Sequence, residues 1–234
     1  GPPRAIFRAA GAGVGPALEG GACDLIAVSG GARALGVFVA YTTIERLRDV
    51  GGDPLAAAVD EVVASLRSRL TLEGLKDDPV VRAYRDFYWR LGIDPTKVRP
   101  SSEALARRAL RGGFPRVSRL VDAGNAASAA TLVPIGIYDL DRLSPPLTIR
   151  LSDGGEEFSP IGGRPTRLPR GYPIMADSRG LVVHLYAHRD SEASAVREST
   201  ARALVVGAGV PGVPRELVRR AVELTVELAA RAGW

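Results

Sequence analysis

Polar side chains of the kinds that bind ligands are concentrated between residues 94 and 142 of this chain. They stand at predicted turns and helix starts, where a side chain can face a ligand. Apolar segments with helical or strand periodicity lie before and after them and are predicted to form the scaffold. The sequence therefore predicts a polar pocket centred on this stretch, without indicating a reaction. Its main polar residues are Ser101, Ser102, Glu103, Asn125, Tyr138 and Asp139.

A second polar group follows the predicted strand at residues 181–186 and consists of His188, Arg189, Asp190 and Ser191. Strand ends are places where side chains reach a cleft, so this group is a candidate for the same pocket. His184 and His188 have the spacing of paired zinc ligands on a helix. Along a strand, however, that spacing is about 13 Å, which is too far for one metal ion with ligand bonds of about 2 Å. No metal site is expected.

The segment Gly207–Gly212 matches the glycine pattern GxGxxG between a predicted strand and a predicted helix. That context is right for a dinucleotide-binding loop. The chain continues with only one helix, so no second strand can complete the βαβ unit that such a site needs. No P-loop or serine nucleophile motif is present either. The sequence therefore predicts no cofactor.

Composition indicates an ordinary globular protein of 234 residues, with 46% hydrophobic and 24% charged residues. No window has the roughly 18 apolar residues of a membrane-spanning helix, and no secretion signal is recognisable. The single cysteine, Cys23, excludes an internal disulfide. These features favour a cytoplasmic protein without a membrane partner.

The net charge is +5, and all but two of the 31 basic residues are arginine. Two interpretations remain open: an arginine-rich composition without a specific role, or a polyanionic partner that the forked guanidinium groups would bind. Five arginines fall within thirteen residues around the predicted third helix. They could form a solvated basic face or contact phosphates. These residues are Arg107, Arg108, Arg111, Arg116 and Arg119.

Strands and helices are mixed along the chain without steady alternation, which predicts an α+β fold with a mixed central sheet flanked by helices. Helices are predicted from Asp53 to Leu70, from Asp78 to Leu91, from Ser101 or Ser102 onward, over 117–130 and over 214–231. Two strands joined by a turn are predicted over 25–41. Residues 1–21 are rich in Gly, Ala and Pro and are predicted to be irregular. A single domain is expected from residue 22 to 234.

Several of these segments resemble the B3/B4 domain of the phenylalanyl-tRNA synthetase beta subunit, in its free-standing form. The resemblance covers residues 25 to 234. It depends on the segments 92–105, 120–125 and 134–141, and on Gly155-Glu156-Glu157-Phe158 and the His188 group. It implies the α+β fold of that domain. It also implies the domain's role in the synthetase, which is to hydrolyse a wrongly attached amino acid, such as tyrosine, from its tRNA.

The resemblance implies roles for individual residues as well. Asn125 matches a pocket asparagine of the family, whereas Gly136 falls where the synthetase motif PLHAFD carries a histidine. This departure implies a different amino-acid preference or loss of hydrolysis. His188 is a candidate replacement for the missing imidazole. Neither a metal nor a covalent nucleophile is required, because an aminoacyl ester is already activated and can be hydrolysed by a positioned water.

The leading hypothesis is therefore a free-standing deacylase that acts on mischarged tRNA, with Asn125 and His188 as catalytic residues. The five arginines would contact the tRNA. The expected substrate-binding residues are Ser101, Ser102, Glu103, Gly136, Tyr138, Asp139, Arg189, Asp190 and Ser191. Two alternatives stay open: a non-catalytic tRNA- or RNA-binding module, and an enzyme or binder for a small, amino-acid-like molecule that uses the same pocket.

Overall fold

One antiparallel sheet forms the middle of the molecule. The computed structural model describes residues 8–10 and 24–234. Strand β11 lies inside this sheet, and its apolar run is buried along almost its whole length. The strand order is β1 (Arg8–Ala10), β3 (Phe38–Glu45), β11 (Arg202–Gly209) and β4 (Ile135–Asp139).

A second, mixed sheet packs against the first. Its strands β2 and β5 are parallel, and the other pairs are antiparallel. A separate short hairpin joins β6 (Glu157–Phe158) to β7 (Thr166–Arg167). The order of the second sheet is β10 (Arg189–Asp190), β9 (Val182–Leu185), β8 (Pro173–Ala176), β5 (Leu147–Leu151) and β2 (Ile26–Val28).

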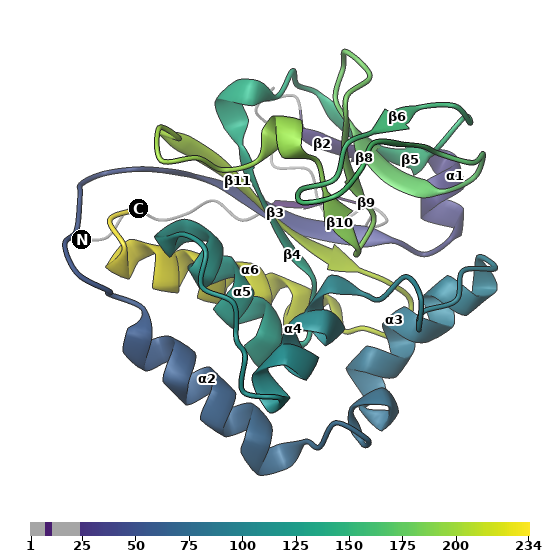
Figure 1. Cartoon of the computed structure of the whole chain (residues 1–234). Coiled ribbons are helices and arrows are strands. Elements are labelled where there is room, and N and C mark those ends of the chain that lie inside the picture. The colour runs from purple at the N-terminus through teal and green to yellow at the C-terminus, as the bar shows by residue number, and fades with distance from the viewer. Residues whose placement is uncertain (1–7, 11–23) are drawn as a thin grey trace.

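Helices cover the face of the first sheet that points away from the second (Figure 1). Helix α6 (Arg215–Arg231) contacts β3 and β11, and α5 (Arg119–Thr131) contacts α6 and β4. Helices α2 (Ala56–Arg69) and α4 (Ser101–Leu110) pack on α5. The remaining helices are α3 (Pro79–Arg90), α1 (Gly30–Ala34) and the 3-10 turns η1 (Leu75–Asp77), η2 (Leu140–Arg142) and η3 (Glu192–Ser194). The predicted α+β class is confirmed, with the strands divided between sheets.

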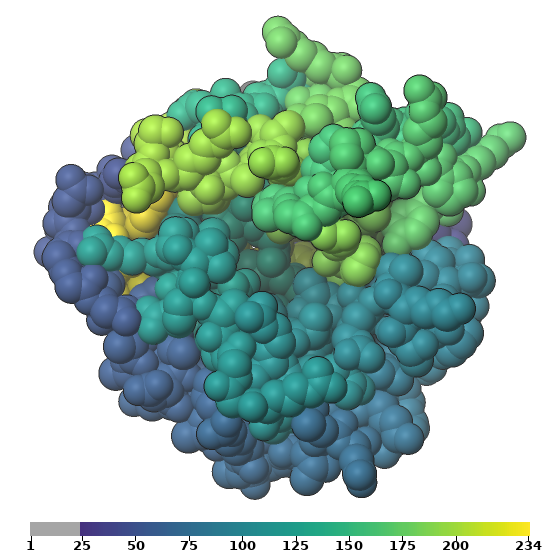
Figure 2. Space-filling model, viewed as in Figure 1, coloured from purple at the N-terminus to yellow at the C-terminus, as the bar shows by residue number. Residues whose placement is uncertain are grey.

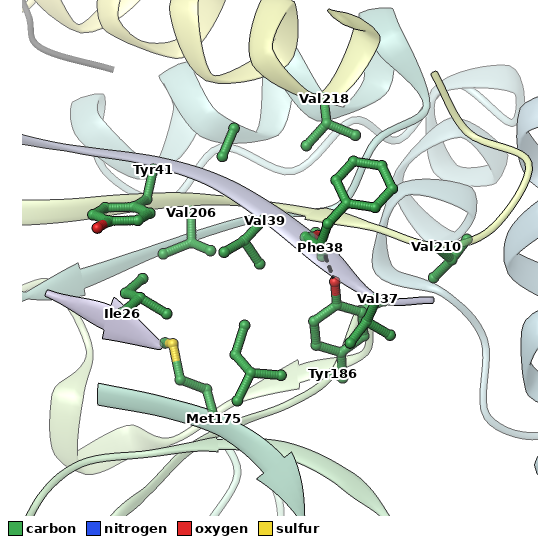
Figure 3. Close-up of a cluster of buried hydrophobic side chains, with 14 of the residues drawn as sticks. Ile26, Val37, Phe38, Val39, Tyr41, Met175, Tyr186, Val206, Val210 and Val218 are labelled. Carbon is green, nitrogen blue, oxygen red and sulfur yellow. Dashed lines mark hydrogen bonds between the residues drawn. The ribbon is translucent and has the colours of Figure 1, made fainter. Parts of the chain in front are cut away.

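The main core lies between the two sheets (Figure 3). Val39 and Val206 of the first sheet point toward Ile26 and Met175 of the second, and all four side chains are buried. Tyr186 crosses the same layer, with its hydroxyl within 2.9 Å of a backbone carbonyl of β3. The small side chains that line α5 let this helix approach the sheet closely. This packing fixes the positions of β4, β9 and α5 relative to one another.

Helix starts follow the predicted signals in some places and not in others. The Asp78 carboxylate accepts hydrogen bonds from the N–H groups of Val80 and Val81, as expected of the residue before an N-terminal proline. No serine side chain caps α4, whose N-cap is Pro100. The Ser101 N–H instead donates to the carbonyl of Ala187, at 2.9 Å. That bond ties the start of α4 to the turn between β9 and β10.

The predicted turn at residues 29–33 is wrong. Ser29 caps a short helix there, α1, by accepting a hydrogen bond from the Ala32 N–H. The segment carries the chain from β2 in the second sheet to β3 in the first, so the two strands are not paired as a hairpin. A segment rich in Gly and Ala is compatible with a hairpin turn and with a short connecting helix, so the sequence did not distinguish the two.

The glycines of the GxGxxG pattern serve packing. Gly207 and Gly209 lie within β11, not in a loop. A Cβ atom at Gly207 would lie 2.9 Å from a methyl group of Val222 on α6, and one at Gly209 would overlap the ring of Phe38. Because these two glycines lack side chains, α6 and Phe38 can pack closely on the strand. The motif therefore has a structural explanation.

Of the predicted irregular segment 1–21, only residues 8–10 are described, and they form β1 beside β3. The rest of that segment, and Cys23, lie outside the described residues. No helix in the described part of the chain is long and apolar enough to cross a membrane.

Candidate functional site

A cavity of about 410 Å³ opens between the helical layer and the second sheet. Helices α4 and α5 form one wall, and β4, β11 and the β9–β10 hairpin form the other. In the space-filling view the surface is hollowed between the teal segment of the helical layer and the green segment of the second sheet (Figure 2). The volume lies within the usual range for small-molecule sites.

Segments far apart in the sequence meet in this cavity. Six residues predicted as catalytic or substrate-binding line it: Ser101, Asn125, Gly136, Tyr138, His188 and Asp190. Asn125 is half-buried on α5, and among the described residues its amide has no hydrogen-bond partner. Its amide is therefore available to a ligand. Apolar side chains form much of the remaining wall, including Leu105, Pro134, Ile135, Leu185 and Val206.

Gly136 leaves room for the side chain of Tyr138, two residues along the same strand. A Cβ atom at position 136 would lie 2.6 Å from Cζ of Tyr138 and closer still to its hydroxyl oxygen. The tyrosine ring folds back over the glycine and is fully buried. Glycine at 136 and the position of the tyrosine hydroxyl are therefore coupled.

The Tyr138 hydroxyl joins two other polar groups of the cavity wall. It lies 2.6 Å from Nδ1 of His184 and 2.9 Å from Oδ1 of Asp190. Burial lowers the pKa of His184 to about 3, so the ring is neutral. Burial raises the pKa of Asp190 to about 6, because the carboxylate receives only the tyrosine hydrogen bond in compensation. At neutral pH the cluster carries one negative charge.

His188 is held at the cavity by the turn between β9 and β10. Ala187, in this turn, has a left-handed backbone conformation with φ 60°. The His188 ring places Nδ1 2.8 Å from the carbonyl oxygen of Arg99. A carbonyl only accepts, so Nδ1 carries the proton and Nε2 has the free lone pair. Burial lowers the pKa of His188, and the nearby Arg189 charge adds to this effect, so the ring is neutral near pH 7.

Glu103 has a structural role outside the cavity lining. Its carboxylate is buried and receives hydrogen bonds from Arg85 and Arg107, each with an N–O distance of 2.9 Å, while Arg99 lies at 3.8 Å. Burial disfavours the charge, but the arginine hydrogen bonds outweigh it and hold the pKa of Glu103 below its usual value. This ion cluster joins α3 to α4.

Four other residues predicted to bind substrate also lie outside the lining. Asp139 accepts a hydrogen bond from Thr200 and is buried at the end of β4. Ser191 caps η3, and Arg189 is exposed with a hydrogen bond to the carbonyl of Ile161. Ser102 is buried in α4. Ser102, Asp139 and Arg189 are next in sequence to residues that line the cavity, and they face away from it. Ser191 faces away because it caps a 3-10 turn.

The five predicted tRNA-binding arginines fall into two groups. Arg107 pairs with Glu103, Arg116 bridges Asp53 and Asp122, and Arg119 donates to the carbonyls of Val50 and Gly52. In contrast, Arg108 and Arg111 are exposed, and no hydrogen bond or ion pair to a described residue holds their side chains. Arg108 also lines the cavity.

Sequence reasoning missed the role of His184. It considered this residue only as a metal ligand, and no group of three possible metal ligands occurs in the described chain. His184 is the cross-strand partner of Asp190 in the β9–β10 hairpin. No turn was predicted after the strand at 181–186, so nothing in the sequence indicated this cross-strand pair. The contact with Tyr138 depends on the packing of two sheets and has no local sequence signal.

A search of curated proteins finds no match. A crystal structure of an N-terminal fragment of the phenylalanyl-tRNA synthetase beta subunit from Pyrococcus horikoshii is similar at 22% identity, with a TM-score of 0.43. The match covers 50% of this chain and 42% of that chain. The model of the B3/4 domain matches residues 83–232, more than half of the chain, so the predicted resemblance is confirmed and the chain belongs to the B3/4 domain family.

Proposed function

We propose that this protein is a deacylase that hydrolyses the ester of a mischarged amino acid on tRNA, acting as a free-standing domain. The observation that carries the proposal is the meeting of Asn125, Ser101 and His188 in one cavity of about 410 Å³. The cavity combines apolar walls for an amino-acid side chain with a few polar groups that can act on an ester.

The neutral His188 ring supplies the base in this proposal. Its Nε2 lone pair accepts a proton from a water as the water oxygen attacks the ester carbonyl carbon. The amide N–H of Asn125 donates to the carbonyl oxygen as negative charge develops there. The bond to the ribose oxygen then breaks, and this oxygen takes the proton from His188. The products are the free amino acid and the uncharged tRNA end.

Two substitutions test these roles. Asn125→Ala and His188→Ala are each expected to lower the deacylation rate about 100-fold, because loss of an oxyanion donor or of a general base has effects of that order. The rate of the wild-type protein should decline only as the pH falls through the lowered pKa of His188, because the protonated ring no longer accepts a proton. The assay is release of amino acid from mischarged tRNA. Arg33→Ala on α1 is the control, and unchanged rates in both site variants would contradict the assignment.

The tRNA surface is proposed to include Arg108 and Arg111, whose side chains are available. Replacing both with alanine should weaken tRNA binding and reduce the slope of log K against log salt by about two, one for each lost phosphate contact. Binding measured at several salt concentrations gives this slope. Arg219→Ala, on the exposed side of α6, is the control. Equal slopes for the double variant and the wild type would place the tRNA elsewhere.

A non-catalytic tRNA-binding module and a small-molecule binder are the two other outcomes of these experiments. Salt-sensitive tRNA binding without turnover would indicate the former. Stabilisation by free amino acids, without tRNA binding or hydrolysis, would indicate the latter.

A further inference from the structure

His184 lines the cavity and has a hydrogen-bonding atom without a partner among the described residues. The residue is 4% exposed and lies in the cavity lining. Its Nδ1 contacts the Tyr138 hydroxyl, whereas its buried Nε2 has no hydrogen-bond partner among the described residues. Buried polar atoms in folded proteins are nearly always paired, and an exception at a cavity wall points to a ligand or an ordered water.

The protons of the cluster determine which kind of ligand group Nε2 can bind. An ionised Asp190 only accepts, so the Tyr138 hydroxyl must donate its single proton to it. The tyrosine oxygen, 2.6 Å from Nδ1 of His184, must then accept the Nδ1 proton. In a neutral imidazole the other nitrogen is then unprotonated. Nε2 is therefore a hydrogen-bond acceptor.

Charges around the cluster favour the same kind of ligand. Asp190 forms no ion pair with a cation among the described residues, and its only side-chain hydrogen bond comes from Tyr138. The ring of Tyr186 packs edge-on against His184, with 5.8 Å between centroids. His188 and Arg108 are the other titratable residues in the cavity lining. The inner end of the cavity thus has an acceptor nitrogen beside an uncompensated carboxylate.

We propose that Nε2 of His184 accepts a hydrogen bond from a donor group of the bound ligand, and that Asp190 and Tyr138 hold it in the acceptor form. Either the α-amino group of an aminoacyl ligand or a side-chain hydroxyl has this chemistry. The inference deepens the proposed function, because it assumes that the same cavity takes an aminoacyl group. It makes His184 a specificity-determining residue.

Non-hydrolysable ligands test the proposal without any turnover. The probes are 3′-aminoacylamino-3′-deoxyadenosines in matched pairs: threonine against valine, tyrosine against phenylalanine, and each with its α-amino group present or replaced by hydrogen. The wild-type protein should bind the member with the critical donor at least about tenfold more tightly. The pair that shows this difference identifies the donor as hydroxyl or amino group. In His184→Phe the difference should vanish. Failure of every probe to bind, or equal preference in the variant and the wild type, would overturn the proposal.

Nitrogen-15 NMR of labelled histidine gives a second readout. It is recorded on the wild-type protein, so it does not depend on whether His184→Phe folds. In the free wild-type protein above pH 6, His184 should show a protonated Nδ1 and an unprotonated Nε2, and the Nε2 signal should shift when the preferred probe binds. As the pH falls through about 6, Asp190 takes up a proton and can donate to Tyr138, so affinity for the donor ligand should fall. A protonated Nε2 at pH 8, or a bound probe that leaves its signal unchanged, would overturn the proposal.

Asp190→Asn keeps the shape of the site and removes the charge. This variant should bind the preferred probe more weakly, and the change in affinity near pH 6 should disappear. An unchanged pH dependence in Asp190→Asn would assign the titration to another group. It would contradict the proposed chain of hydrogen bonds from Asp190 through Tyr138 to His184.

The outcomes separate this inference from the proposed function. Probe binding through His184 without any hydrolysis would support the inference and contradict the deacylase. Hydrolysis of mischarged tRNA at an unchanged rate in His184→Phe would support the deacylase and contradict the role of His184.

Discussion

Replacing Gly136 with alanine is expected to destabilise the protein by about 4 kcal/mol, the sum of an overpacked core position and lost buried hydrogen bonds. The new Cβ atom would lie 2.6 Å from Cζ of Tyr138 and would overlap its hydroxyl. The tyrosine is 1% exposed, so the new Cβ atom would displace a ring that is packed in the core. Its displacement would break the hydrogen bonds to His184 and Asp190. Chemical denaturation of both proteins measures the loss.

Gly113→Ala is the matched control, because a Cβ atom at Gly113 meets nothing within 4 Å and its φ angle is not in the left-handed region. It should change stability by less than about 1 kcal/mol. A Gly136→Ala protein as stable as the wild type would mean that the tyrosine moves without cost. That result would contradict the coupling between position 136 and the Tyr138 hydroxyl. A larger side chain at this position, such as histidine, would meet the same obstacle.

Replacing Glu103 with glutamine should cost about 3–5 kcal/mol, the range for breaking a buried ion pair. The variant would leave Arg85, Arg99 and Arg107 close together without a counter-charge. The Nε atom of Arg99 is already buried without a hydrogen-bond partner among the described residues, and Glu103 at 3.8 Å is its counter-charge. Helices α3 and α4 would lose the contact that joins them, and α4 carries Ser101 and Arg108 into the cavity wall. Denaturation at neutral pH measures the loss.

The pH dependence of this effect has a definite sign. The folded-state pKa of Glu103 is lowered, so its contribution is fully present above the ordinary glutamate pKa of about 4.3 and disappears as the pH falls through the lowered value. The difference between wild type and Glu103→Gln should therefore shrink below about pH 4. Glu227→Gln, in the exposed pair with Arg220, should cost at most about 1 kcal/mol. Similar losses for both variants would contradict the buried cluster.

Local signals in the sequence predicted the helices and the convergence of the polar segments. The Asp78-Pro79 start of α3 is a cap whose mechanism acts within four residues, so the sequence alone is sufficient. The pocket residues Ser101, Asn125 and Tyr138 were grouped because they lie in one polar-rich stretch of the sequence, and the family resemblance then implied a role for Asn125. Their meeting in one cavity depends on α4, α5 and β4 packing side by side.

Contacts that depend on tertiary packing could not be read from the chain. Glu103 has the type and position of a residue that complements a helix dipole, and only the packing of α3 on α4 makes it the centre of an arginine cluster. His184 sits in an apolar strand, and its partners come from β4 and β10. Gly136 could be recognised as a departure from the family pattern. Its physical meaning required the position of the Tyr138 ring.

The most direct test of the proposed deacylase is release of amino acid from a panel of tRNAs, each charged with either its correct or an incorrect amino acid. The protein is used at a concentration far below that of the tRNA, so that turnover is required. We expect at least one mischarged tRNA to be hydrolysed many times per protein molecule while its correctly charged counterpart is spared, and we expect Asn125→Ala to lose this activity. Absence of turnover on every mischarged tRNA, by a protein that binds tRNA and is folded, would contradict the account.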